Sequence, residues 1–156
     1  MQKKTDLIIR RFQDEDAKQV SKVIQRTMLE SNSQDYPMTI LQPLHDYFTP
    51  EKVAVLATER HCLVAIIENK IVGTGALEED ELKTIFVSPS YQGKGIGRQI
   101  VHELEKIAKQ IGISSLKVPT SITGMHFYEK MGYLRGATFE SKHAGQQTWM
   151  QKTNIH

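Results

Sequence analysis

A glycine-rich segment at residues 92–98 carries the strongest chemical signal in this sequence of 156 residues. Its alternating glycines are Gly93, Gly95 and Gly97. Glycines let backbone N–H groups approach a ligand closely, and an amphipathic helical pattern begins directly after them. The N-terminus of a helix carries partial positive charge, and Lys94 and Arg98 add two full charges. The segment therefore predicts an anion site, most naturally for a phosphate or pyrophosphate. The alternative is a tight strand-to-helix turn, which would not require three glycines flanked by basic residues.

The spacing of these glycines excludes two common phosphate loops. A P-loop has the pattern G-x-x-x-x-G-K-[ST], but here Lys94 is followed by glycine and position 88 is Ser88. A dinucleotide fingerprint has the pattern G-x-G-x-x-G, but the third glycine position falls on Arg98 or on Ile100. A generic nucleotide-binding domain is therefore disfavoured.

Periodicity predicts the elements that position this loop. Alternation and β-branched runs predict strands over residues 7–12, 62–67, 71–77, 82–87, 115–119, 133–139 and 146–150. Apolar residues at steps of three and four predict helices over residues 17–29, 95–111 and 121–131, and Thr49-Pro50 resembles a further helix start. Residues 31–50 are expected to form a loop with short helical pieces. The order is a mixed α/β layout with a βαβ unit at its centre.

Two motifs now support a resemblance to a known family. The segment from Gln92 to Gly97 matches the Q/R-x-x-G-x-G/A signature of the GNAT superfamily, the acyl-CoA-dependent N-acetyltransferases. Residues 118–133, with Phe-Tyr-Glu-Lys ahead of Gly-Tyr, resemble the family's later segment. The resemblance covers essentially the whole chain, so residues 1–156 are expected to be a single acetyltransferase domain. It implies an α/β fold with a mixed, mostly antiparallel central sheet flanked by helices on both faces.

The resemblance also implies where coenzyme A would bind. The pyrophosphate would lie on the loop residues Gln92, Gly93, Lys94, Gly95, Ile96, Gly97 and Arg98, largely on their N–H groups. The pantetheine arm would pair with the strand end at Ile85, Phe86 and Val87 as an extra strand. Ser121 stands where many relatives carry Asn, and Gly124 where many carry Ala. Ser121 can still make one hydrogen bond to the arm, with a shorter reach.

Candidate catalytic groups follow from the same comparison. Tyr128 matches the tyrosine that commonly lies near the thioester sulfur, where its phenol could protonate the departing thiolate. The alternative is a core aromatic residue whose hydroxyl bonds elsewhere. For the base, Glu81 is the best single candidate in the acidic run 78–81. Strand alternation would place Glu79 and Glu81 on one side and Glu78 and Asp80 on the other, whereas a solvated hairpin turn is the alternative.

The expected reaction is acetyl transfer from acetyl-CoA to a primary amine of a small molecule or peptide, by direct attack in a ternary complex. The alternative is a non-catalytic module that binds or senses acyl-CoA. Polyamines, aminoglycosides, amino acids, peptides and protein lysines all remain open as acceptors. Tyr36, His45, Tyr47 and Phe48 are candidate acceptor contacts, with surface or core packing equally open. Dimers are common in the family, so a homodimer is one expectation.

Composition narrows the partners and the compartment. A net charge of +2, from 20 Lys+Arg and 18 Asp+Glu, argues against a dedicated nucleic-acid binder. The longest strongly apolar run, Leu63–Ile67, is far too short to span a membrane, and residues 1–11 lack the apolar core of a signal peptide. The single cysteine, Cys62, suits a reducing cytoplasm and is expected to be a small apolar strand residue. No His or Cys spacing predicts a metal site.

Overall fold

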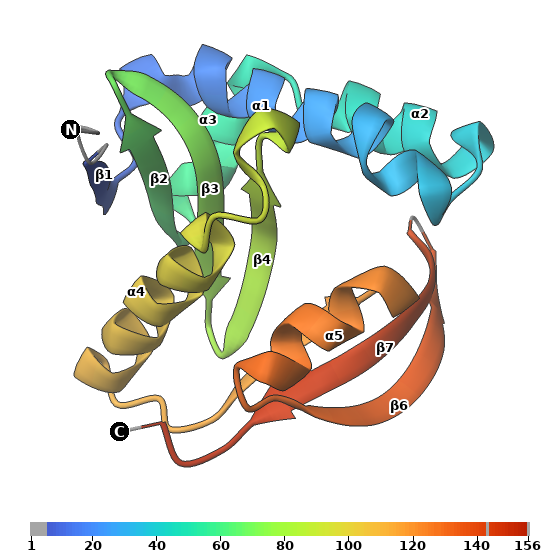
Figure 1. Cartoon of the computed structure of the whole chain (residues 1–156). Helices are drawn as coiled ribbons and strands as arrows, with labels where there is room; N and C mark the ends of the chain where they lie inside the picture. Colours follow the sequence, from blue (N-terminus) through green and yellow to red (C-terminus); the bar gives the residue numbers. More distant parts are fainter. Residues whose placement is uncertain (1–5, 143, 156) are drawn as a thin grey trace, which may run out of the picture.

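The computed structural model describes residues 6–142 and 144–155. Residues 1–5, which belong to the N-terminal segment without a signal-peptide core, therefore lie outside the described residues. The strands are β1 Leu7–Arg11, β2 His61–Ile67, β3 Lys70–Glu78, β4 Glu81–Val87, β5 Leu116–Thr120, β6 Leu134–Ser141 and β7 Gly145–Lys152. The α-helices are α1 Ala17–Glu30, α2 Met38–Tyr47, α3 Pro50–Thr58, α4 Ile96–Gln110 and α5 Ile122–Lys130. Figure 1 shows their arrangement.

The strands form one sheet that splits in its middle. Its order is β1-β2-β3-β4-β5-β7-β6, and every neighbouring pair is antiparallel except β4 and β5. That parallel pair is joined at a single position, Glu81 opposite Lys117. Beyond this point no described residue of β4 pairs with β5, and Figure 1 shows β4 and β7 running in different directions. The predicted mixed, mostly antiparallel sheet is confirmed, and the split gives β4 a free edge.

Helices cover both faces of the β1–β4 part of the sheet, as expected. One core cluster includes Val20 and Ile24 of α1 with Val64 of β2, and the other includes Leu104 of α4 with Leu82 of β4. Burial of these apolar side chains is the main term that holds the layers together. None of the helices among the described residues is both long enough and apolar enough to cross a bilayer.

Helix α4 lies unusually close to β3 because β3 carries a glycine beneath it. A Cβ at Gly75 would overlap Ile100 of α4 and come within 2.8 Å of Ile85 Cδ1 on β4. The close approach fixes the N-terminal half of α4 against the central strands. It thereby fixes the position of the glycine-rich loop that precedes α4.

The one element that the sequence understated is α2. Residues 31–50 were expected to be a loop with short helical pieces, and they contain a short 3₁₀ turn at Asn32–Gln34 and the ten-residue α2. Pro43 lies inside α2 and interrupts the usual helical signal. Elsewhere the expected boundaries agree with the structure to within about two residues, a normal difference for helix and strand ends.

Candidate functional site

The split between β4 and β5 opens into a cleft of about 1550 Å³. It is lined by β4, the end of β5, the loop before α4, α5, the segment from α1 to α2, and the tip of the β6–β7 hairpin. All the predicted catalytic and coenzyme A-binding residues line this cleft except Lys94, whose ammonium instead lies 5.3 Å from the centre of the Tyr91 ring. An ordinary small-molecule pocket measures roughly 300–1,000 Å³. The cleft therefore has room for two substrates together.

The glycine-rich loop presents open backbone at the mouth of the cleft. Gly93 and Gly95 have φ angles of +77° and +80°, which glycine adopts without strain. A Cβ at Gly93 or Gly95 would meet no atom within 4 Å, whereas a Cβ at Gly97 would contact Phe127 at 3.4 Å, so the first two glycines are the open part of the loop. Gly95 is the N-cap of α4, and no side-chain hydrogen bond caps that end. The first N–H groups of α4 are thus available to an anion.

Gln92 ties this loop to its surroundings. Its Nε2 donates to the carbonyl of Val87 at 3.0 Å and to Ser31 Oγ at 3.1 Å. The Val87 carbonyl also accepts a hydrogen bond from Thr27 Oγ1 at 3.3 Å. Both amide hydrogens of Gln92 are therefore engaged within the protein. The Gln92 side chain therefore holds the loop against the end of β4.

The free edge of β4 forms one wall of the cleft. A bulge interrupts its pairing with β3 between Thr74 and Ala76, and Thr84 has a φ of +50° there. Bulges bend a strand and redirect its side chains. Among the described residues no strand pairs with β4 on the β5 side beyond Glu81. An extended ligand could therefore pair with Ile85–Val87 as a further strand.

Tyr128 lies in the floor of the cleft on α5. Its ring is 6% exposed and packs edge-to-face on Phe127 and Tyr133, with ring centres 4.9 Å and 5.7 Å away. Its hydroxyl hydrogen-bonds to no described residue, and burial raises its pKa above the ordinary value. The hydroxyl is therefore a neutral O–H donor at physiological pH. By contrast, the Tyr133 hydroxyl donates to Glu105 at 2.8 Å and is part of the core.

The acidic run 78–81 forms a tight hairpin instead of a continuous strand. Glu78 and Glu81 are cross-strand partners, and Glu79 and Asp80 make the turn, with a φ of +54° at Glu79. The strand ends at Glu78, so the alternative of a hairpin turn holds, and alternation along a strand does not apply to Glu79 and Glu81. Glu81 lines the cleft, whereas Glu78 is engaged by Arg60 and Lys83.

Two side-chain contacts close the cleft on the side away from the glycine loop. The carboxylate of Asp35 accepts hydrogen bonds from Ser121 Oγ, at 3.1 Å, and from Thr123 Oγ1. Gln147 of β7 donates to the hydroxyl of Tyr36, whose pKa is raised chiefly by burial. The donor hydrogen of Ser121 is thus already used, so toward a ligand this hydroxyl can act only as an acceptor.

The departure from the family pattern at Gly124 has a steric reason. A Cβ at this position would overlap Thr120 Oγ1, so the glycine makes room for the threonine at the end of β5. Of the candidate acceptor contacts, Tyr36, Tyr47 and Phe48 line the cleft, and His45 does not. Asp35 and Arg60 were not predicted, because a single charged residue beside an irregular segment matches no motif.

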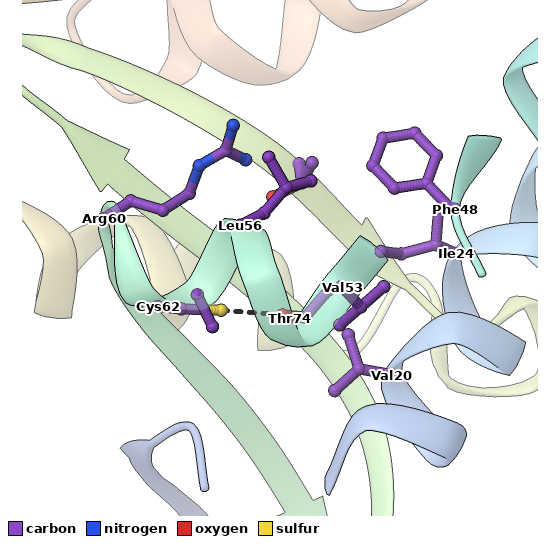
Figure 2. A pocket seen from close by; sticks show the side chains of 10 residues that line it. Val20, Ile24, Phe48, Val53, Leu56, Arg60, Cys62 and Thr74 are labelled. Carbon is purple, nitrogen blue, oxygen red and sulfur yellow. Dashed lines mark hydrogen bonds between the residues drawn. The ribbon is translucent and has the colours of Figure 1, made fainter. Parts of the chain in front are cut away.

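A second, small cavity of about 20 Å³ lies beneath α3, with Cys62 in its wall (Figure 2). The thiol lies 3.9 Å from Thr74 Oγ1, and burial raises its pKa. A raised pKa disfavours the reactive thiolate. The described residues include no group of His, Cys, Asp or Glu side chains arranged to hold a metal ion.

The fold and the cleft together define a class: a split-sheet α/β domain with a glycine-rich loop at the mouth of the split. The family model described as an acetyltransferase (GNAT) domain matches residues 58–135. The chain belongs to the GNAT acetyltransferase family.

Individual relatives agree with this assignment. A Bacillus subtilis (strain 168) protein, named as a candidate acetyltransferase, is 39% identical over 80 residues, covering 51% of each chain. The crystal structure of a GCN5-related N-acetyltransferase from Rhodopseudomonas palustris superimposes with a TM-score of 0.87, at 22% identity, over 98% of this chain and 99% of that one. PaiA N-acetyltransferase from Thermoplasma acidophilum, solved in complex with coenzyme A, gives 0.79 at 19% identity over 95% and 99%. The two structures establish the fold. The chain spans about half the length of the curated relatives that it matches.

Proposed function

We propose that this protein transfers the acetyl group of acetyl-CoA to a primary amine of a small molecule or peptide, in a ternary complex of enzyme and both substrates. The observation that carries the proposal is the cleft between β4 and β5. It combines open glycine backbone at its mouth, a free strand edge along its wall and an unpartnered tyrosine hydroxyl in its floor. Cys62 is the only cysteine in the sequence, and burial raises its pKa, which makes it a poor nucleophile. A route in which a cysteine first takes up the acetyl group is therefore disfavoured.

The residues of the cleft fit coenzyme A. The backbone of Gly93–Gly97, open at Gly93 and Gly95, would hold the pyrophosphate, with Arg98 beside it. The free edge at Ile85–Val87 would pair with the pantetheine arm, while Gln92 keeps loop and strand end together. Bound there, acetyl-CoA supplies a thioester whose carbonyl carbon forms a bond to the amine nitrogen while its C–S bond breaks.

Two proton transfers remain for the protein. The amine must lose its protons before and during attack, and Glu81, which lines the cleft, is the proposed acceptor, directly or through water. The departing sulfur becomes negative, and the Tyr128 hydroxyl is the proposed donor to it. Burial keeps Tyr128 protonated, and a hydrogen bond from a neutral phenol to a developing thiolate is stronger in a buried site than in water. Alignment of the two substrates in one cleft supplies further acceleration.

Release of free thiol from acetyl-CoA, measured across a panel of amines, tests the proposal. We expect at least one amine to accelerate release, and Tyr128→Phe to lower kcat by about 100-fold, the lower end of what general acid–base groups contribute. Stability should change little because no described residue bonds to this hydroxyl. Tyr133→Phe is the matched control: it should lose stability, because it removes the bond to Glu105, and largely keep its turnover. Tight binding of acetyl-CoA with no amine-dependent release would instead identify a binding or sensing module.

We also place the protein in the cytoplasm, where an unpaired cysteine such as Cys62 stays reduced.

A further inference from the structure

Arg60 is a mostly buried cation on the wall of the cleft. It lies between α3 and β2, and its side chain is 11% exposed. Its Nε donates to Glu78 Oε1 at 3.2 Å. No other described residue hydrogen-bonds to the guanidinium, so both terminal nitrogens are free to bind a ligand. Figure 2 shows this group directed away from Cys62 and Thr74.

Lys83 on β4 is a second cation on the same wall. Its Nζ donates to Glu78 Oε2 at 3.1 Å, so two cations share one carboxylate. The hydrogen bond from Lys83 is the main cause of the lowered pKa of Glu78, with burial opposing it. Glu78 therefore stays ionised, and the three side chains keep an excess of one positive charge. The other charged residues that line the cleft are Asp35, Glu81, Arg98, Lys130, Glu140 and Lys142.

Glu81 lies two residues before Lys83 on the same strand, which places both side chains on one face of β4. Their Cα atoms are then about 7 Å apart. No ion pair engages Glu81 among the described residues. This wall thus presents the Glu81 carboxylate, which forms no ion pair with a described residue, beside two cations that share the single carboxylate of Glu78. A ligand that carries an ammonium and a carboxylate would match both.

Apolar side chains also line the cleft. They are Met28, Leu44, Tyr47, Phe48 and Leu56, and two of them, Phe48 and Leu56, line the small cavity together with Arg60. A polyamine or an aminoglycoside offers several cations and no apolar body, so Arg60 and Lys83 would repel it. A phosphate monoester carries two negative charges, which Glu78 and Glu81 would oppose. A single carboxylate matches the planar fork of an arginine in both shape and charge.

We propose that the acetyl acceptor is an amino acid with an apolar side chain, whose carboxylate is bound by the free face of Arg60 with support from Lys83. This inference rests on the proposed function and names its substrate class. Its amine would face Glu81 and the thioester, and its side chain would lie against the apolar side chains of the cleft. Arg60 is then the specificity-determining residue of the acceptor site.

The test compares acceptors that differ only in the carboxylate: L-phenylalanine with L-phenylalaninamide and 2-phenylethylamine, and L-leucine with L-leucinamide. With the wild-type protein we expect kcat/KM for thiol release to be at least about 10-fold higher for the acids. Arg60→Gln should lower kcat/KM for the acids by about 10- to 100-fold and bring the acid-to-amide ratio close to one. Arg60→Lys, which keeps the charge without the fork, should fall between. Arg26→Gln, at an exposed arginine of α1, should leave the ratio as in the wild type.

Calorimetric titration of L-phenylalanine into the protein loaded with coenzyme A gives a second readout, with weaker binding expected for Arg60→Gln. Because Arg60 also contacts Glu78, the melting temperature and the affinity for coenzyme A are measured for each variant. If Arg60→Gln does not fold, Lys83→Gln removes the second cation and should lower the acid-to-amide ratio. Amides or amines used as well as the acids by the wild type would overturn this inference and leave the proposed function standing. Binding of acetyl-CoA with no release on any amine would overturn the proposed function, and the inference with it.

Discussion

The carboxylate of Asp35, in the segment between α1 and α2, accepts a hydrogen bond from the hydroxyl of Ser121 at the start of α5. The same carboxylate accepts a second bond from Thr123 Oγ1. These contacts join the segment before α2 to α5, the helix that carries Tyr128. The position of this segment in the cleft is therefore linked to the position of Tyr128, the proposed acid.

Replacing Asp35 with alanine should loosen the segment over residues 31–47. Two hydroxyls lose a charged acceptor, so we expect a loss of about 1–2 kcal/mol in the free energy of unfolding. Amide hydrogen exchange in this segment should accelerate more than exchange in the sheet, and KM for the amine should rise. Asp46→Ala is the control, because Asp46 bonds only to Gln42 and His45 within α2. Equal exchange rates in the two variants would contradict a linking role for Asp35.

Glycines 95 and 112 have nearly the same left-handed backbone, with φ angles of +80° and +86°, but only Gly95 lies in the cleft. Glutamate at either position should cost about 1–2 kcal/mol of stability through backbone strain. Gly95→Glu should also place a negative charge beside the pyrophosphate and weaken coenzyme A binding by at least about 10-fold. Gly112→Glu should bind coenzyme A as the wild type does. Calorimetric affinities for the two variants decide the matter, and unchanged affinity in Gly95→Glu would refute the assigned phosphate loop.

Thr120 and Gly124 should behave as a compensating pair. Gly124→Ala places a methyl group on Thr120 Oγ1, and such overpacking typically costs about 1–3 kcal/mol. Adding Thr120→Ala removes the oxygen and should recover most of that loss, whereas Thr120→Ser keeps the oxygen and should recover little. Urea unfolding of the single and double variants gives the coupling free energy. Additive effects would mean that the backbone of α5 shifts to relieve the overlap.

Asp16 should give the protein part of its acid sensitivity. Burial alone would raise the pKa of this carboxyl, but hydrogen bonds from Arg10 and from the N–H of Gln13 outweigh it and lower the pKa below 3.8. Because the folded-state pKa is the lower one, the stabilisation is complete above the unfolded-state value and is lost as the pH falls through the folded-state value.

The corresponding variant is Asp16→Asn, measured by urea unfolding at pH 7, 5 and 3. We expect it to cost about 2 kcal/mol at pH 7 and 5, and clearly less at pH 3. Asp14→Asn, at an exposed carboxylate nearby, should change stability little. If the loss in the free energy of unfolding caused by Asp16→Asn is as large at pH 3 as at pH 7, Asp16 stabilises the fold through hydrogen-bond geometry and not through its charge.

Much of the fold was predictable because its signals are local. Alternation predicts the strands, the glycine after residue 111 marks the end of α4, and residues 92–97 match the signature of the family. The strands beside the split were predicted, but the split itself was not. It depends on a bulge at Thr84 and on one cross-strand position at Lys117, and neither has a sequence signature.

The candidate site was predictable only where its residues belong to contiguous motifs. The glycine loop and Tyr128 belong to contiguous motifs, and the cleft includes them. Asp35 and Arg60 come from segments far apart in the sequence, and only the folded chain brings them to one cavity. The acidic run had two interpretations, a continuing strand or a hairpin turn, because Glu79 and Asp80 are polar like their neighbours, and the structure shows the turn.

Strand pairing joins β4 to β5 only at Glu81 and Lys117 among the described residues. Val87, at the far end of β4, lies about 20 Å from this pairing, because six residues of strand each span about 3.3 Å. The spacing around the proposed base is therefore set by backbone pairing, whereas the width of the mouth is set by side-chain contacts such as that of Asp35 with Ser121.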